Sequence, residues 1–583
     1  RCGGCENNCQ LTVSDFGGGR RYVTGNRCEK GALDGRTKAD VPNLMQYKFK
    51  RIFDYEPLAE AEAERGTIGI PRVLNLYENY PFWATLFRAL KFRVVLSPPS
   101  SKKIYNLGIE TIPSESECYP AKLTHGHLQW LIDQGVKTIF YPCVFYEYKE
   151  DPQSQNHFNC PIVMSYPENL RNNMELLWGD QIKFLHPFVA FTDLDTIRER
   201  LETVLERDLG VPRQETAQAA KLAWEEQRRC KEDIAREGER VLRWVEEGRH
   251  NAIVLAGRPY HCDPEINHGI PEMIASYGYA VLTEDSVAHL AQREEGGGKK
   301  MEHPLRVTDQ WTYHARLYAA AAFVRDRDDL DLVQLNSFGC GVDAVTTDQV
   351  SEILTGAGKL YTLLKIDEVN NLGAARIRIR SLICALRMRK ERNIHAKPTA
   401  PVAYRRAEFT REMRKEGYTL LCPQMSPIHF DLIEPAIRQF GYNVEVLRND
   451  DRSAIDTGLK YVNNDACFPT LTVVGQIMEA VLSGQYDTDH LAIMMTQTGG
   501  GCRASNYVGF IRLALEREGL GHIPVVSLNA NGMEKNSGFH YTPMMLLKAV
   551  QALLLGDTLM CMLYRVRPYE AQPGAADALH HKW

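Results

Sequence analysis

Apolar stretches of two kinds alternate along most of the chain. Short runs rich in Val, Ile and Leu, such as 93–96 and 252–256, have the length of buried strands, whereas 118–134 carries apolar residues at helical spacing. Strands that alternate with helices at this pitch predict βαβ units around a parallel sheet. The expected strands are 68–76, 93–96, 138–141, 252–256, 280–282, 332–335 and 361–366. They form two series, which predict one α/β lobe in 67–190 and a second in 251–395.

The segment 191–250 between these lobes is strongly charged. Its apolar residues follow helical spacing, at Leu222, Trp224, Val241, Leu242, Trp244 and Val245. This pattern predicts long amphipathic helices that bridge the two lobes or pack on a partner.

The strand–helix rhythm starts a third time in 396–583. Residues 438–447 align with 88–97 at a shift of 350, and Cys467-Phe-Pro aligns with Cys118-Tyr-Pro at a shift of 349. This internal similarity predicts that the last lobe duplicates the first. The fold class is therefore expected to be α/β, with several Rossmann-like or flavodoxin-like lobes built on parallel sheets.

Composition narrows the class of protein. The 583 residues are 44% hydrophobic and 25% charged, which excludes fibrous and disordered chains. A net charge of −5 argues against nucleic-acid binding driven by bulk charge. The longest apolar run, near 319–324, is far shorter than a membrane helix, and no signal peptide is visible. We expect a cytoplasmic protein with no membrane or nucleic-acid partner.

Fifteen cysteines and the absence of a secretory signal predict thiolate metal ligands rather than disulfides. Residues 1–40 lack apolar periodicity and therefore need a metal to hold them together, and 41–66 looks like a connector. Four cysteines lie in this module, with two, three and eighteen residues between them: Cys2, Cys5, Cys9 and Cys28. Four thiolates suit a 4Fe-4S cluster or tetrahedral zinc. Because the chain opens with Arg1 and this cluster, we expect it to be a piece of a longer protein.

A second set of cysteines is dispersed through the first two lobes. Cys118 lies in Glu-Cys-Tyr-Pro at an expected strand-to-helix turn, Cys143 follows the strand 138–141, and Cys340 follows the strand 332–335. Ligands of open parallel sheets gather at the carboxyl ends of the strands. The three cysteines are therefore expected to converge and to leave an open iron for substrate or electron chemistry.

The duplicated lobe offers a matching set. Cys467 corresponds to Cys118, and Cys502 follows the strand 491–495 as Cys143 follows its own. No cysteine lies near 529–533, where the counterpart of Cys340 is expected, so Cys422 is the best third candidate. The other cysteines are weaker candidates: Cys160, Cys230, Cys262, Cys384 and Cys561. Packing or chance explains Cys230 and Cys384, which lie on expected helices, whereas Cys262 lies in a loop after a strand that could face the cleft, and Cys160 beside Pro161 is similar.

Three histidines near the expected cleft are weak candidates for proton donors: His125, His261 and His429. A hydrogen-bonded structural role is the simpler interpretation for each. The chain contains no Gly-x-x-x-x-Gly-Lys-Ser/Thr phosphate loop and no convincing Gly-x-Gly-x-x-Gly turn. We therefore expect no nucleotide site within it.

These motifs resemble known iron–sulfur proteins. Residues 68–388 resemble the iron–sulfur subunits of 2-hydroxyacyl-CoA dehydratases and benzoyl-CoA reductases, with Cys118, Cys143 and Cys340 at the family's cluster positions. The Phe-Gly-Cys-Gly loop departs from the family's Cys-Asp form. The whole chain, with Cys-Gly-Gly-Cys and Gly-Asn-Arg-Cys-Glu-Lys-Gly near its start, resembles the C-terminal half of large fused acyl-CoA dehydratase activase-like proteins, relatives of the double-cubane cluster proteins.

The resemblance implies partners and cofactors. ATP would act through upstream or separate ATPase domains of the acetate-kinase type, supplied with electrons by a ferredoxin or flavodoxin. A double-cubane 8Fe-9S cluster would draw on six cysteines, Cys118, Cys143, Cys340, Cys422, Cys467 and Cys502. A homodimer is a further expectation.

The leading hypothesis is an oxidoreductase module that receives ATP-driven low-potential electrons and reduces a small molecule at a cluster between lobes. The first alternative is a 2-hydroxyacyl-CoA dehydratase-like enzyme with a single 4Fe-4S cluster. The second is a non-enzymatic electron-storage protein or a scaffold structured by zinc.

Overall fold

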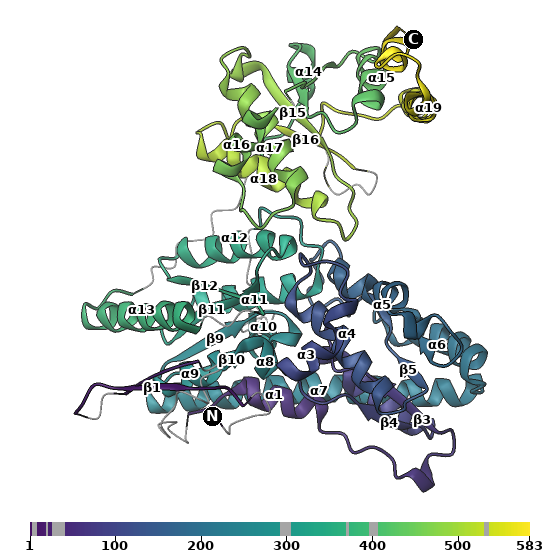
Figure 1. Ribbon diagram of the computed structural model, residues 1–583. Coiled ribbons are helices and arrows are strands. Elements are labelled where there is room, and N and C mark those ends of the chain that lie inside the picture. The colour runs from purple at the N-terminus through teal and green to yellow at the C-terminus, as the bar shows by residue number, and fades with distance from the viewer. Residues whose placement is uncertain are drawn as a thin grey trace. The chain divides into compact units, whose positions relative to one another are not determined.

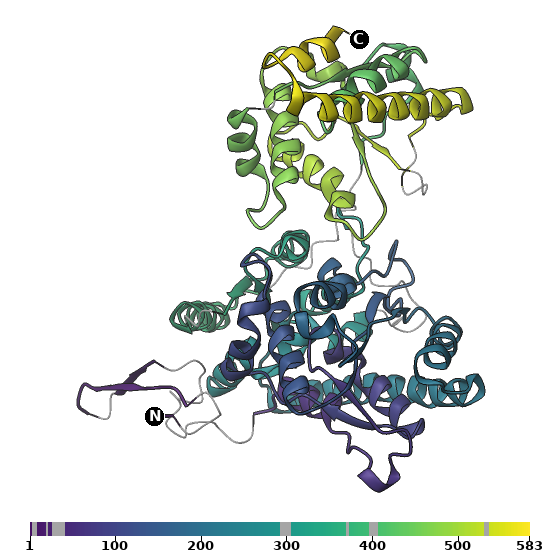
Figure 2. The same cartoon turned by 45° about the vertical axis from the view of Figure 1, so that its right-hand side comes forward.

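The computed structural model divides the chain into two compact units. Unit 1 comprises Arg1–Leu305 and Asp309–Val402, and unit 2 comprises Arg306–Thr308 and Ala403–Trp583 (Figures 1 and 2). The structure describes residues 1–2, 8–18, 21–25, 41–291, 305–368, 372–395, 406–449, 451–529, 534 and 536–582. The predicted ligands Cys5 and Cys28 lie outside these residues.

The first sheet of unit 1 is parallel and has the strand order β4-β3-β5-β7. Its strands are β3 (Thr67–Ile70), β4 (Arg93–Leu96), β5 (Thr138–Phe140) and β7 (Lys183–Leu185). The helices of this lobe are α2 (Leu76–Ala89), α3 (Lys102–Gly108), α4 (Tyr119–Asp133) and α5 (Pro161–Asn173). Two further strands, β6 (Cys143–Tyr146) after β5 and β8 (Phe188–Ala190) after β7, form a separate short parallel pair.

The second sheet of unit 1 is also parallel, in the order β10-β9-β11-β12. Its strands are β9 (Ala252–Ala256), β10 (Ala280–Thr283), β11 (Leu330–Ser337) and β12 (Tyr361–Ile366). Its longer helices are α10 (Glu284–Ala291), α11 (Thr312–Arg325), α12 (Gly341–Thr355) and α13 (Leu372–Glu391). One continuous hydrophobic core contains residues of both sheets, including Ile68 and Phe140 of the first with Ile253 and Val281 of the second.

Three helices outside the sheets support this joint core. The segment expected as a connector contains α1 (Leu44–Phe53), whose buried Lys48 pairs with Asp285 at 2.7 Å. The charged segment forms α6 (Leu194–Leu209) and α7 (Arg213–Gly248), separated by Gly210 in the left-handed conformation. α7 packs on α2 of the first lobe and on α10 of the second. One 36-residue helix thus connects the two lobes of unit 1 (Figure 1).

Unit 2 contains a third parallel sheet, in the order β14-β13-β15-β16. Its strands are β13 (Thr419–Cys422), β14 (Asn443–Val446), β15 (Leu491–Thr496) and β16 (Val525–Leu528). Its main helices are α15 (Pro427–Arg438), α16 (Arg452–Tyr461), α17 (Phe468–Leu482), α18 (Tyr507–Arg517) and α19 (Pro543–Val566). All three sheets share the order 2-1-3-4, which is flavodoxin-like. The predicted α/β architecture with several parallel-sheet lobes is confirmed.

Two local predictions were wrong. The run 68–76 is not one strand, because β3 ends at Ile70 before Pro71 and the same apolar stretch continues into the buried helix α2. Cys118 does not follow a strand, since α3 and a short 3-10 turn (Ile109–Thr111) precede it. Its turn therefore joins two helices.

The C-terminal helix α19 also differs from the sequence-based expectation. Within the described residues, the segment Pro543–Tyr569 is long and apolar enough to cross a membrane by length and composition, and 17% of its most apolar window is buried. The sequence run was not recognised because Lys548 and Asp557 interrupt it. Figure 2 shows this helix lengthwise, in yellow.

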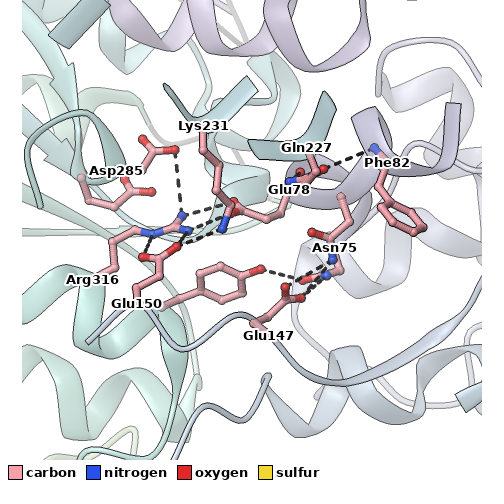
Figure 3. A network of polar contacts seen from close by, with 12 residues as sticks. Asn75, Glu78, Phe82, Glu147, Glu150, Gln227, Lys231, Asp285 and Arg316 are labelled. Atoms are coloured by element: carbon pink, nitrogen blue, oxygen red, sulfur yellow. Dashed lines mark hydrogen bonds and ion pairs between the residues drawn. The ribbon is translucent and has the colours of Figure 1, made fainter. Parts of the chain in front are cut away.

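A buried network of charges joins α2, α7 and α11 in unit 1 (Figure 3). Arg316 of α11 binds Glu78 at 2.7 Å and Glu150 at 2.5 Å, and Lys231 of α7 reaches the same two carboxylates at 3.2 and 3.1 Å. Although burial raises the pKa of Glu78, the charges of Arg316 and Lys231 hold it below its ordinary value. These groups line a cavity of about 580 Å³. The network ties together helices that belong to different lobes.

Candidate functional site

Three cysteines of unit 1 occupy the same position, the residue that precedes a helix. Cys118 is the N-cap of α4, Cys160 of α5 and Cys340 of α12, each with extended backbone dihedrals. All three side chains are partly exposed. The first turn of a helix carries backbone N–H groups without intrahelical partners and the positive end of the helix dipole. The helix start therefore favours a negative charge at each cysteine, whereas burial opposes it at Cys118 and Cys340.

The three thiols are electrostatic neighbours. Burial and then the charge of Cys160 raise the pKa of Cys118 to about 12. Burial and the charge of Asp343 raise the pKa of Cys340, and Cys160 contributes to the same shift. Cys340 also packs in one apolar cluster with Phe158, just before Cys160 in sequence. The charge of Cys160 thus acts on both Cys118 of the first lobe and Cys340 of the second.

The structure places Cys143 differently. It is the first residue of β6, it is fully buried, and burial and then the charge of Glu168 raise its pKa to about 12. The charges of Cys143 and Cys118 both act on Tyr141. They add to the effect of burial, which is the largest cause of its raised pKa. The sequence analysis did not choose Cys160 as a ligand. A proline nevertheless follows it directly, as Pro120 follows Cys118 after one residue, and proline is common in the first turn of a helix.

Among the described residues, no three His, Cys, Asp or Glu side chains are grouped so that they could hold a metal ion. In a cubane each cysteine binds a different iron, so the ligand sulfurs lie farther apart than around one ion. Binding of iron by Cys118, Cys160 and Cys340 would require each thiol to lose its proton.

A buried carboxyl fixes the loop that carries Cys160. Glu147 accepts hydrogen bonds from the amides of Asn75 at 2.5 Å, Asn79 at 3.1 Å and Asn159 at 2.9 Å (Figure 3). Burial and then the charge of Glu78 raise the pKa of Glu147 to about 7. Its proton is therefore retained in the folded state at pH values where the unfolded chain has lost it.

This shift predicts a pH effect on stability. Since the folded state binds one more proton between pH 4.5 and 7, the free energy of unfolding should fall by roughly 2–3 kcal/mol as pH rises through that range. Glu147→Gln cannot titrate and keeps the accepting oxygen. Urea unfolding should show that this variant gains stability relative to the unsubstituted protein between pH 5 and pH 8. Exposed Glu175→Gln is the control, and an equal difference at both pH values for Glu147→Gln would contradict the argument.

Each of the three candidate histidines has hydrogen-bond partners within the protein, a pKa lowered by burial, or both. His125 binds Thr111 Oγ1 at 2.8 Å and Tyr166 OH at 3.0 Å, and burial lowers its pKa to about 4. Burial lowers the pKa of His261 to about 3. His429 of unit 2 lies between Ser426 Oγ at 2.7 Å and Asp557 Oδ1 at 2.9 Å. His125 and His261 are therefore uncharged at neutral pH.

Unit 2 repeats the helix-start cysteines. Cys467 is the N-cap of α17, and Cys502 precedes the 3-10 turn Arg503–Asn506 that leads into α18. The Cys467 sulfur lies 2.9 Å from Tyr507 OH and 3.1 Å from Thr470 Oγ1. Burial raises the pKa of Cys467, but these hydrogen bonds and Arg503 outweigh it, so the pKa is lowered. Cys467 is thus prepared to act as a thiolate.

The remaining predicted ligands are less grouped. Tyr507 lies near both Cys467 and Cys502, whose charges add to the effect of burial on its pKa. Cys422 instead belongs to the hydrophobic core of unit 2, where burial raises its pKa to about 12. At the N-terminus, the Cys2 N–H donates to the Cys9 carbonyl at 2.8 Å. The four-cysteine module remains a prediction, because Cys5 and Cys28 lie outside the described residues.

Comparison with known proteins gives one family match. A search of curated proteins finds nothing that matches the chain. Residues 67–287 match the family model described as the CoA enzyme activase uncharacterised domain. The matched segment contains Cys118, Cys143 and Cys160 and ends within α10, before Cys340. This part of the chain is therefore related to acyl-CoA dehydratase activase-like proteins.

Proposed function

We propose that the chain is an iron–sulfur reductase module that receives ATP-driven low-potential electrons and reduces a small molecule beside Cys118, Cys160 and Cys340. The observation that carries this proposal is that three cysteines of unit 1 each precede a helix, and that the charge of Cys160 acts on the other two. The family match supports the link to an ATP-dependent activase, either upstream in the same polypeptide or separate. In this proposal Cys160 replaces the Cys143 that sequence reasoning selected.

The protein's own groups suit this chemistry. When bound, a 4Fe-4S cluster supplies one-electron transfer at low potential. The three cysteines would hold such a group, and the helix N-termini would offset part of the negative charge of the thiolates. The surrounding apolar residues, among them Phe158, Met164 and Trp311, exclude water from the Cys340 side of the site. Cys118 and Cys160 border the core that the two lobes share.

The proposal includes further groups. Cys2, Cys5, Cys9 and Cys28 would hold a second 4Fe-4S cluster that takes up electrons, with ferredoxin or flavodoxin as the donor to the activase. In unit 2, Cys467 and Cys502 would be cluster ligands, with Cys422 as the third candidate. A double-cubane cluster of the 8Fe-9S type and a homodimer belong to the same proposal.

A second candidate function follows from the description of the matched family, which names a CoA enzyme. A dehydratase-like protein would hold one open 4Fe-4S cluster in unit 1 and act on a 2-hydroxyacyl-CoA. It requires the same three cysteines but no cluster in unit 2.

Iron, acid-labile sulfide and zinc per chain, measured on anaerobically purified protein, distinguish the candidates. We expect about 12 iron atoms, because each cubane carries about 4 and the proposal contains one N-terminal cubane and a double cubane. About 8 iron atoms would favour the dehydratase-like enzyme. Zinc with little iron would reject both and leave a structural scaffold.

A further inference from the structure

The second sheet of unit 1 brings an arginine and a candidate ligand to one edge. Arg258 lies two residues after β9, and Cys340 lies three residues after β11. These strands are neighbours in the order β10-β9-β11-β12, and the chain reverses its direction of winding between them. Open parallel sheets form their ligand crevice at this point. Arg258 and Cys340 thus flank the crevice of this sheet.

Buried partners hold the Arg258 side chain in one orientation. Its Nε and Nη2 donate to Asp343 Oδ1 at 3.0 and 2.6 Å, and Nη2 also donates to His314 Nε2 at 2.7 Å. Arg258 is 4% exposed, Asp343 2% and His314 0%. Asp343 lies in the first turn of α12, the helix that Cys340 caps. The guanidinium is therefore tied to the helix whose N-terminus carries the thiol.

The same group contains buried donors without acceptors. Arg258 Nη1, His314 Nδ1 and His261 Nε2 have no hydrogen-bond partner. Because His314 Nε2 accepts from Arg258 and His261 Nδ1 accepts from the Arg258 backbone N–H at 2.8 Å, the proton of each neutral ring is on the unpartnered nitrogen. Buried donors are nearly always satisfied in native proteins. The three unpartnered donors on and beside Arg258 leave capacity for a further acceptor.

Charge also connects Arg258 with the cysteine site. The arginine lowers the pKa of Cys340 against the effect of burial, and Cys340 and Cys160 are among the charges that raise the pKa of Arg258. Because Asp343 engages only two of its three nitrogens, Nη1 is available for a further acceptor. Sulfur atoms of a cluster accept hydrogen bonds and carry more negative charge after reduction.

We propose that Arg258, oriented by Asp343 and His314, is a positioning residue that stabilises the negative charge added when an iron–sulfur cluster held by Cys118, Cys160 and Cys340 is reduced. The inference rests on the proposed function. Reduction adds one electron from an external donor, no bond forms or breaks in the protein, and Arg258 remains a cation throughout. Its positive charge and its free N–H favour the reduced form and thereby raise the reduction potential of the site.

The test is a dye-mediated dithionite titration of the full chain, followed by electron paramagnetic resonance. Arg258→Gln should lower the midpoint potential of the unit 1 site, and Arg258→Lys should restore most of it. Asp343→Asn should shift the potential upward, because it leaves the arginine charge uncompensated. Opposite shifts at two paired residues distinguish an electrostatic role from a loss of structure. Arg228→Gln, on the exposed face of α7, is the control and should leave the potential unchanged.

The outcomes separate this inference from the function on which it rests. Iron at the level of the unsubstituted protein with an unchanged potential in Arg258→Gln would overturn the inference alone. If Arg258→Gln does not retain iron, the midpoint potential of Asp343→Asn tests the inference instead. An unchanged or lowered potential in Asp343→Asn would then overturn it. If the unsubstituted protein binds no iron, the proposed function fails and this inference fails with it.

Discussion

Cys160→Ser should remove about 4 iron atoms per chain, the content of one cubane, whereas Cys143→Ser should retain them. A serine hydroxyl keeps its proton at neutral pH and is a poor ligand for iron. The charge of Cys160 acts on both Cys118 and Cys340, and Cys160 is partly exposed, so its loss should disrupt the proposed site more than the loss of the enclosed Cys143. Iron and acid-labile sulfide assays on anaerobically purified variants measure the difference.

A buried thiol outside the site provides the control. Cys230 lies on the buried face of α7, and Cys230→Ser should change packing but not iron content. The reverse pattern, with iron lost from Cys143→Ser and retained in Cys160→Ser, would restore the ligand set predicted from the sequence. Equal iron in all three variants would remove unit 1 from the proposed function.

Arg316→Met should destabilise unit 1 by about 3–5 kcal/mol, because it removes the arginine that pairs with the buried carboxylates of Glu78 and Glu150 and leaves Lys231 as their ion-pair partner. A methionine of similar length preserves packing but not charge. Six of the seven tryptophans belong to unit 1, so the tryptophan fluorescence during urea unfolding reports mainly on this unit.

The matched control is an exposed ion pair on the same helix as Lys231. Arg228 pairs with Glu232 at 2.6 Å, with side chains 68% and 48% exposed. Arg228→Met should cost less than about 1 kcal/mol, since water screens such pairs. A similar small cost for Arg316→Met would show that the buried network adds little to the stability of unit 1.

The sequence predicted the sheets well because their strands are short, β-branched and bounded by turns. The strands 93–96, 252–256 and 361–366 were predicted with the bounds of β4, β9 and β12. The run 68–76 was misassigned because a fully buried helix and a buried strand look alike in hydrophobicity. Only the tertiary fold shows that α2 is apolar on nearly every face.

The candidate site was predicted in part. Cys118 and Cys340 were selected from turn patterns that a single sequence displays. Cys160 follows an irregular segment with no strand before it, and its proximity to Cys340 depends on Phe158 pairing with Trp311, 153 residues away. The contact of Arg258 with Asp343 spans 85 residues. No local periodicity encodes such pairs, so composition and spacing could not identify them.

The helix α7 has a consequence for how a metal site in unit 1 would assemble. Cys118 and Cys160 belong to one lobe and Cys340 to the other, and α7 packs on helices of both. Docking of this helix restricts the relative motion of the lobes when the chain folds. The loss of conformational entropy that brings the three thiols together then occurs during folding. Metal insertion meets a preorganised set of ligands and has little chain disorder left to remove.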